Sequence, residues 1–251
     1  MEDPKSAELI KPFLAGRDIK RYVKPDVKKY VILIPKGFTL QFCKNKKTAW
    51  IWFRDTYPAI ASHLKPFEEK AKKRYDKGDF WWELRACDYY QEFEKPKIIY
   101  PNICKRNIFT FDTDFLYTNQ KCFIIPEGTK YLLGVLNSKT IFFLFKEILP
   151  KLRGEFYEPS YVFMKDFPIP GEPQGEKNET EFIELRNKIE NLVSEMLKTQ
   201  EAYYKACTET DKKILKQKID LLDVQIDASV YRHYGLAEEE IEIIEESVPG
   251  G

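Results

Sequence analysis

The chain has few of the residues and patterns on which common catalytic and structural sites depend. Its 251 residues include two histidines and five cysteines, and no two cysteines form a Cys-x-x-Cys pair. The sequence therefore indicates neither a disulfide framework nor a zinc site, and such cysteine usage fits a reducing cytoplasm. No Gly-rich loop of the dinucleotide-binding or P-loop type occurs, so no phosphate cradle is visible.

Long hydrophobic runs are also lacking. No stretch approaches the roughly 18 apolar residues that a helix needs to cross a bilayer. The polar, acidic start Met1-Glu2-Asp3-Pro4 is unlike a secretory signal. Hydrophobic residues at 43% and aromatic residues at 15% nevertheless provide enough apolar surface for a core. We expect a globular, cytoplasmic protein without a membrane partner, built as one large domain or as one domain with an appendage.

Charge is divided unevenly along the chain, although the net charge is only +1. Residues 1–175 hold 31 Lys and Arg against 22 Asp and Glu, a net charge of +9, and residues 176–251 hold 10 against 18, a net charge of −8. This division indicates a basic binding body followed by an acidic tail that faces solvent or a partner. A chance imbalance on a charged surface is the alternative interpretation.

The hydrophobic pattern predicts an α+β fold for the first two thirds of the chain. Helical spacing extends from Trp50 to Phe67, with a polar continuation to Arg74, and returns in residues 130–149. Short β-branched and aromatic runs predict a mainly antiparallel sheet, in part a meander, and the first of them reads as a buried strand. These strand candidates are residues 30–35, 97–103, 108–112, 116–125 and 161–164.

The pattern changes near residue 170. Residues 168–175 contain three prolines and two glycines, which is typical of a linker. Beyond it, apolar residues at spacings of three and four predict two helices that form an antiparallel hairpin and end at Gly235. A short acidic helix at 236–246 follows. The predicted organisation is a recognition body at 1–170, a linker at 171–177 and a helical spacer or docking region at 178–251.

Aromatic and basic residues are concentrated between Arg74 and Asn102. The Trp81-Trp82 pair lies between a basic run with a Gly turn and Arg85. Cations suit phosphates, and flat rings and guanidinium groups suit bases, so this stretch favours a nucleic-acid surface. A Trp pair beside a turn can equally be part of a core. A third arrangement has the two rings facing opposite ways.

Several short motifs follow one another in the order found in a known family. They are Phe13-Leu14-x-Gly16-Arg17-Asp18-Ile19-x-Arg21-Tyr22, Trp82-x-Leu84-Arg85 with Lys97-Ile98-Ile99-Tyr100-Pro101, Leu136-Asn137-Ser138, Phe167-Pro168-Ile169-Pro170 and Tyr234-Gly235-Leu236. Through them residues 5–247 resemble the carboxy-terminal specificity region of TaqI-like adenine-specific DNA methyltransferases, including fused type IIG restriction-modification enzymes. The resemblance implies a target recognition domain that reads duplex DNA, followed by spacer or docking helices.

Two motifs of the family's methyltransferases are missing from this sequence. Methyltransferases of the family carry an S-adenosylmethionine loop and an Asn-Pro-Pro-Tyr or Asn-Pro-Pro-Phe motif, and neither occurs here. The resemblance therefore implies a catalytic methyltransferase domain elsewhere in the same polypeptide, which would flip and methylate the target adenine. We expect no catalytic residue, metal or cofactor in this chain. S-adenosylmethionine, and magnesium if a nuclease is fused, would belong to the parent enzyme.

Three kinds of DNA contact are expected from the side chains of the body. Trp81 or Trp82 could pack against a sugar or an opened base. Candidates for base edges, chosen because Arg suits guanine and Asn suits adenine, are Arg85, Lys105, Arg106, Asn107 and Asn119. Candidates for phosphate contacts, which give affinity and register, are Arg17, Lys20, Arg21, Lys44, Lys46, Lys47, Lys72, Lys73 and Arg74.

The sequence leaves two other functions open. Pro25-Asp26 and Glu68-Glu69-Lys70 contain the residue types of a metal-dependent endonuclease, although the Glu-x-Lys lies in a helical charge run instead of a strand. A helical assembly scaffold with incidental basic charge is the second alternative.

Overall fold

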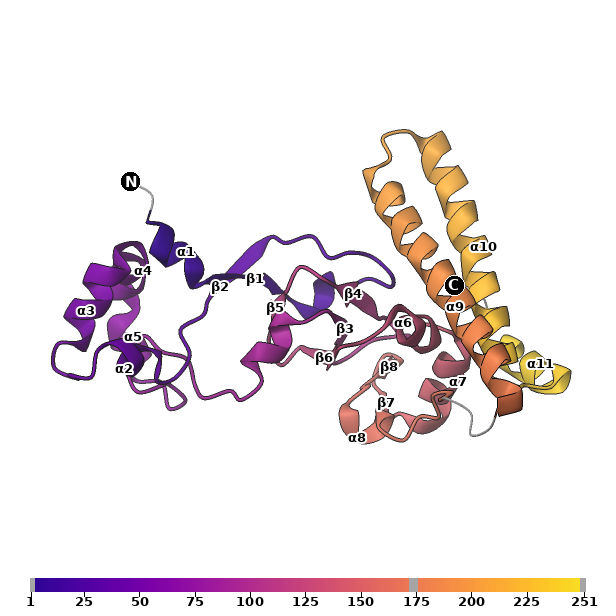
Figure 1. Cartoon of the computed structure of the whole chain (residues 1–251), viewed down its shortest axis with the longest axis horizontal. Coiled ribbons are helices and arrows are strands. Elements are labelled where there is room, and N and C mark those ends of the chain that lie inside the picture. Colours follow the sequence, from indigo (N-terminus) through magenta and orange to yellow (C-terminus); the bar gives the residue numbers. More distant parts are fainter. Residues whose placement is uncertain (1–2, 172–175, 249–251) are drawn as a thin grey trace. The chain divides into compact units, whose positions relative to one another are not determined.

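The computed structural model describes residues 3–171 and 176–248 and has a mixed α+β fold (Figure 1). The chain divides into two compact units, which are described separately below. Unit 1 comprises Met1–Phe13, Val27–Glu94 and Phe115–Tyr117, and unit 2 comprises Leu14–Asp26, Lys95–Asp114 and Thr118–Gly251. The boundaries at 170 and 178 stay a prediction, and part of the predicted linker, residues 172–175, lies outside the described residues.

Unit 1 combines a small sheet with short helices. Strand β1 (Ile10–Leu14) pairs antiparallel with β2 (Lys29–Ile32), and β5 (Tyr117–Thr118) lies on the other side of β1. The buried strand expected at 30–35 is only partly correct, because Tyr30 in β2 is 65% exposed and burial begins at Leu33, after the strand. The helices are α1 (Pro4–Glu8), α2 (Phe38–Phe42), α3 (Ala49–Thr56), α4 (Pro58–Leu64) and α5 (Glu68–Lys72).

Proline divides the helical pattern expected over residues 50–74. Pro58 occupies the first turn of α4, and Pro66 lies in a 3-10 turn, η2 (Lys65–Phe67), between α4 and α5. Proline has no backbone N–H and is tolerated in the first turn of a helix but not in its interior, so each proline lies in the first turn of a new segment. A second 3-10 segment, η3 (Tyr90–Glu94), precedes the chain's passage into unit 2.

Unit 2 is built on an antiparallel sheet with β3 (Lys97–Pro101) at its centre. β3 pairs with β4 (Thr110–Asp112) and with β6 (Cys122–Pro126), as predicted for an antiparallel body. The single strand expected at 116–125 is wrong, because a turn at Asn119 separates β5 from β6. Lys97 and Asp112, both fully buried, form an ion pair of 2.5 Å between β3 and β4.

Short elements surround this sheet. Helices α6 (Lys130–Leu136) and α7 (Lys139–Ile148) confirm the interrupted helical pattern of 130–149, and Ser138 caps α7. A 3-10 turn, η1 (Gly16–Asp18), and a hairpin of β7 (Lys151–Leu152) and β8 (Phe156–Tyr157) complete the body. The strand expected at 161–164 is wrong: it is helix α8 (Tyr161–Met164), in which Ser160 O accepts hydrogen bonds from Phe163 and Met164.

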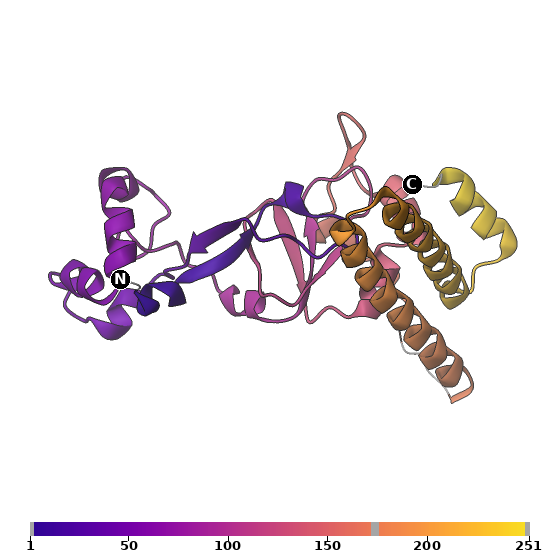
Figure 2. The same cartoon turned by 90° about the horizontal axis from the view of Figure 1, so that it is seen from above.

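Two long helices confirm the predicted hairpin. Helix α9 (Glu176–Lys205) and helix α10 (Glu209–Tyr234) lie side by side, followed by α11 (Glu238–Ser247) (Figure 2). Gly235 ends α10 with φ +67°, the left-handed conformation expected of a C-terminal glycine. The apolar side chains of the hairpin, including Ile189, Val193 and Ile226, belong to one buried cluster with Ile98 and Phe109 of the sheet region.

Candidate nucleic-acid interface

The Trp pair lies in the core of unit 1. Trp81 and Trp82 are 9% and 7% exposed, and Trp50 packs against both with ring centroids 4.9 and 5.1 Å away. The Trp82 indole donates to Thr39 Oγ1 at 3.0 Å, which fixes its orientation. The core interpretation therefore fits the structure, and an orientation in which one ring points freely into solvent does not.

A buried carboxylate that was not predicted from the sequence organises the loop before the Trp pair. Glu83 is fully buried and accepts hydrogen bonds from the backbone N–H groups of Thr39 at 2.9 Å and Asp79 at 2.8 Å. Arg74 donates to the carbonyl oxygens of Trp81 and Glu83 at 3.0 and 2.8 Å. Arg74 therefore holds the turn, so the expected phosphate contact is not its main role. In the sequence, the only signal for the buried role of Glu83 was its position next to two tryptophans and near a Gly turn.

Other cations of unit 1 remain exposed. Lys44, Lys46 and Lys47 lie on a polar loop, where Asn45 Oδ1 accepts the N–H of Lys47 at 3.0 Å. Lys73 and Arg85 are exposed as well. Lys72 differs because it pairs with Glu68 at 2.9 Å and with Glu69 at 3.3 Å on α5. The loop lysines are thus the better placed phosphate candidates, since neighbouring acids already neutralise Lys72 in part.

In unit 2, the basic segment after η1 is used inside the protein. Arg21 donates hydrogen bonds to Asp223 of α10 through both terminal nitrogens, Nη1 to Oδ2 at 2.5 Å and Nη2 to Oδ1 at 2.7 Å. Its Nη2 also donates to Asn137 O at 2.7 Å. The Lys20 ammonium lies 4.5 Å from the centroid of the Tyr204 ring on α9. The phosphate contact expected for Arg21 does not fit the structure, because this residue joins the body to the hairpin. Lys20 is exposed and still accessible.

Two of the expected base readers are structural. Asn107 is fully buried, and its Nδ2 donates to the carbonyl oxygens of Leu136 and Ser138, both at 2.8 Å. The Arg106 guanidinium lies 6.0 Å from the Phe142 ring, and burial lowers its pKa. The base contact expected for Asn107 does not fit, because its amide connects the β3–β4 loop to the start of α7. Arg106 is only partly accessible.

The remaining candidates of unit 2 come together on neighbouring loops. A Cβ on Gly16 would lie 2.5 Å from the Lys121 carbonyl oxygen, so only glycine allows η1 to pack against the β5–β6 turn. This contact places Arg17 beside the turn that contains Asn119, whose Oδ1 accepts the N–H of Lys121 at 3.0 Å. The Arg17 side chain is 80% exposed.

The β3–β4 loop joins the same group of loops. The Asn102 N–H donates to the Lys121 carbonyl at 3.0 Å, and the exposed Lys105 lies over the Phe156 ring at 5.2 Å. We call the exposed side chains of Arg17, Asn119 and Lys121 the loop cluster. Lys121 was not predicted from the sequence, in which a Lys next to the Asn turn was the only signal for it.

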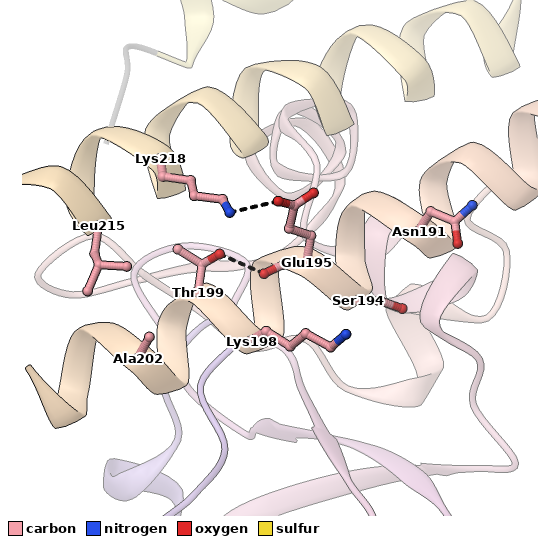
Figure 3. A pocket seen from close by; sticks show the side chains of 8 residues that line it. All are labelled: Asn191, Ser194, Glu195, Lys198, Thr199, Ala202, Leu215 and Lys218. Carbon is pink, nitrogen blue, oxygen red and sulfur yellow. Dashed lines mark hydrogen bonds and ion pairs between the residues drawn. The ribbon is translucent and has the colours of Figure 1, made fainter.

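The hairpin carries a groove of a different character. It has a volume of about 510 Å³ and lies between α9 and α10 (Figure 3). Its lining combines both signs of charge, with Glu195 and Lys218 paired at 2.7 Å across the helices, and Thr199 donates to the Glu195 carbonyl at 2.8 Å. Its lining holds two lysines, Lys198 and Lys218, and one carboxylate, Glu195, which pairs with Lys218, so this groove is a poor site for a polyanion.

The residue types of a metal nuclease do not assemble among the described residues. No group of three or more His, Cys, Asp or Glu that could hold a metal is present there. Glu68 is instead paired with Lys65 and Lys72 on and beside α5. Among the same residues, no helix has the length and apolar character required to cross a membrane.

Comparison with known proteins gives a family. A family model, the TaqI-like C-terminal specificity domain, matches residues 11–169, and this chain belongs to that family. No curated protein matches the sequence. Among solved structures, the type IIL restriction-modification enzyme MmeI in complex with DNA is similar, with a TM-score of 0.60 and 15% identity over 97% of this chain. The chain spans 31% of the length of that enzyme, and the likeness shows the fold.

Proposed function

We propose that this chain is the DNA target recognition domain of a restriction-modification enzyme that methylates adenine. It binds duplex DNA sequence-specifically and presents the target adenine to a catalytic methyltransferase domain of the same polypeptide. The membership in the TaqI-like specificity family carries the proposal. The solved similar enzyme is a DNA complex, which supports the choice of DNA as partner.

The arrangement of exposed cations supports two modes of contact. In unit 1, Lys44, Lys46 and Lys47 offer ammonium groups from one polar loop, which suits phosphates and contributes affinity without sequence information. In unit 2, the loop cluster combines a guanidinium with an amide on two turns that pack closely. Arg and Asn on well-fixed turns suit base edges in the major groove.

Catalysis is assigned to the absent domain. S-adenosylmethionine would bind there, as would magnesium if a nuclease is fused. This chain's residues only bind and orient DNA. We expect the chain alone to transfer no methyl group and to cut no DNA in the presence of magnesium. Cleavage abolished by Glu68→Ala would instead support the nuclease alternative.

The test is the salt dependence of duplex binding by the full chain. Fluorescence anisotropy with a labelled duplex of random sequence should give micromolar or weaker affinity that falls steeply with salt, because neutralised phosphates release counterions. Lys46→Glu with Lys47→Glu should weaken binding and reduce the salt slope by about 2.

A matched control changes the same amount of charge on the acidic hairpin. Lys188 and Lys198 are exposed on α9, and the double change to Glu should leave the slope almost unaffected. Binding that ignores salt, or equal losses in both double variants, would contradict a phosphate-binding role for the lysine loop.

A further inference from the structure

Unit 1 contains a pocket beside the Trp pair that the proposed function does not use. Its volume is about 350 Å³, and its walls include Leu64, Phe67, Ala71, Trp81 and Trp82. The remaining residues that line it are aliphatic, apart from the cations Lys70 and Arg74, and no carboxylate belongs to the lining. Pockets of this size, apolar with a few fixed polar groups, are typical of small-ligand sites.

The aromatic walls are held in place before any ligand binds. Trp82 stacks on Phe80 with centroids 4.6 Å apart and an interplanar angle of 10°, and its indole N–H is occupied by Thr39. Trp81 meets Trp82 edge to face at 5.5 Å. Phe53 also stacks on Trp82, with centroids 5.6 Å apart, so the pocket meets only a small, rigid part of the Trp pair. Phe67, which is 53% exposed, supplies the accessible aromatic surface of the lining, on which a flat ring can pack.

Arg74 gives this pocket its polar character. Its Nη2 is used by the carbonyl oxygens of Trp81 and Glu83, which fixes the guanidinium. Its Nε is buried and has no hydrogen-bond partner among the described residues. Because that nitrogen is buried, Arg74 offers a ligand in the pocket the positive charge of its guanidinium and not its Nε. Lys70, exposed on α5, adds a second positive charge.

We propose that this pocket binds an unpaired nucleobase, with the attached backbone phosphate held by Lys70. A base is flat, carries acceptors for a guanidinium, and has an anionic group at the distance of one sugar. An aliphatic side chain of a protein partner would fill the apolar walls but would offer no charge to the two cations. The inference rests on the proposed function, since it places a nucleotide of the DNA in unit 1.

The experiment compares two single-stranded oligomers of twelve nucleotides, one of thymidines and one with abasic sites throughout. All four tryptophans, at positions 50, 52, 81 and 82, belong to unit 1, so intrinsic fluorescence reports on the pocket. The full chain should bind the thymidine oligomer about tenfold more tightly than the abasic one, with quenching of Trp emission, because base stacking on an aromatic wall adds to phosphate binding. Equal affinities would overturn the proposal.

Substitutions that fill or open the pocket locate the effect. Ala71→Phe should abolish the preference for bases, whereas the matched change Ala59→Phe, at an exposed alanine outside the pocket, should keep it. If Ala71→Phe fails to fold by near-UV circular dichroism, Phe67→Ala replaces it, because Phe67 is 53% exposed and its removal leaves the core intact. This variant should reduce the preference about threefold.

Two outcomes separate this inference from the proposed function. A base preference that a folded pocket variant, Ala71→Phe or its replacement Phe67→Ala, leaves unchanged overturns the pocket assignment, even if duplex binding by the chain stays salt-dependent. Loss of duplex binding with a retained, pocket-dependent base preference would overturn the proposed function and leave the pocket intact. Inorganic phosphate, which lacks a ring, should not quench Trp emission, and quenching by it would also count against a base site.

Discussion

Gly134 determines how closely helix α9 approaches the body of unit 2, and replacing it tests that packing. A Cβ on Gly134 would lie 2.7 Å from Ile189 Cγ2 and 2.9 Å from Val193 Cγ2. Both partners are fully buried on α9, so neither methyl group can move into solvent. The change to test is Gly134→Ala, which adds one methyl group at the point of contact between α6 and α9.

Two opposing effects set the magnitude of this change. Alanine favours the helix over glycine by about 1 kcal/mol. Overpacking of a closely packed core costs about 1 to 3 kcal/mol. We therefore expect Gly134→Ala to reduce the free energy of unfolding by roughly 0 to 2 kcal/mol, despite its better helix propensity. Val193→Ala removes one of the two crowded methyl groups. The double variant should therefore be less destabilised, by about 1 kcal/mol, than the sum of the two single changes.

The assay is urea unfolding followed by far-UV circular dichroism, with wild type, both single variants and the double variant compared. Gly171→Ala is the control, because nothing lies within 4 Å of a Cβ at that position. A Gly134→Ala protein more stable than wild type, together with strict additivity with Val193→Ala, would refute the close contact between α6 and α9.

Two further predictions concern buried polar contacts of α10. Arg21→Gln removes the contact with Asp223 and should destabilise the protein by about 2 kcal/mol in the same assay, whereas Lys20→Gln should cost less than about 1 kcal/mol. Burial raises the Asp227 pKa to about 6, against the opposing effect of the Lys139 N–H bond, so the native state holds this proton more tightly than the unfolded chain. Stability therefore falls as pH rises from about 4 to 6, and Asp227→Asn should resemble wild type at pH 4 but exceed it by roughly 2 kcal/mol at pH 7; a constant difference would contradict this.

Local patterns were sufficient to predict part of the fold. The hairpin follows from spacings of three and four over many turns, and Gly235 adopts the left-handed conformation expected of it. Short apolar runs were less informative, because a run of four residues such as Tyr161–Met164 fits a strand or a helix equally well. The separation of β5 from β6 depends on the Asn119 turn and on pairing with different strands, which is long-range information.

The candidate site was harder to predict, because a basic residue looks the same in sequence whether it faces DNA or a carboxylate. Arg21 meets Asp223, which lies 202 positions away, and no local pattern links them. Asn107 has the residue type of a base reader, yet its amide is satisfied by carbonyl groups that only the fold brings near. The exposure of loop residues such as Lys46 could be predicted from the local sequence alone, because it does not depend on distant partners.

The hairpin connects these observations to the domain organisation. The linker and the single apolar stripe of each helix predict that a truncation after Pro170 stays folded and keeps most of its DNA affinity. The shared core argues otherwise, because Ile189, Val193 and Ile226 are fully buried in one cluster with Ile98. Each such side chain contributes about 1.5 to 3 kcal/mol, so losing several would remove most of a typical stability of about 5 to 15 kcal/mol. We therefore expect residues 1–170 to lose fixed side-chain packing in unit 2, seen as a weakened near-UV circular dichroism spectrum, and a cooperative, native-like unfolding transition would instead favour separable domains.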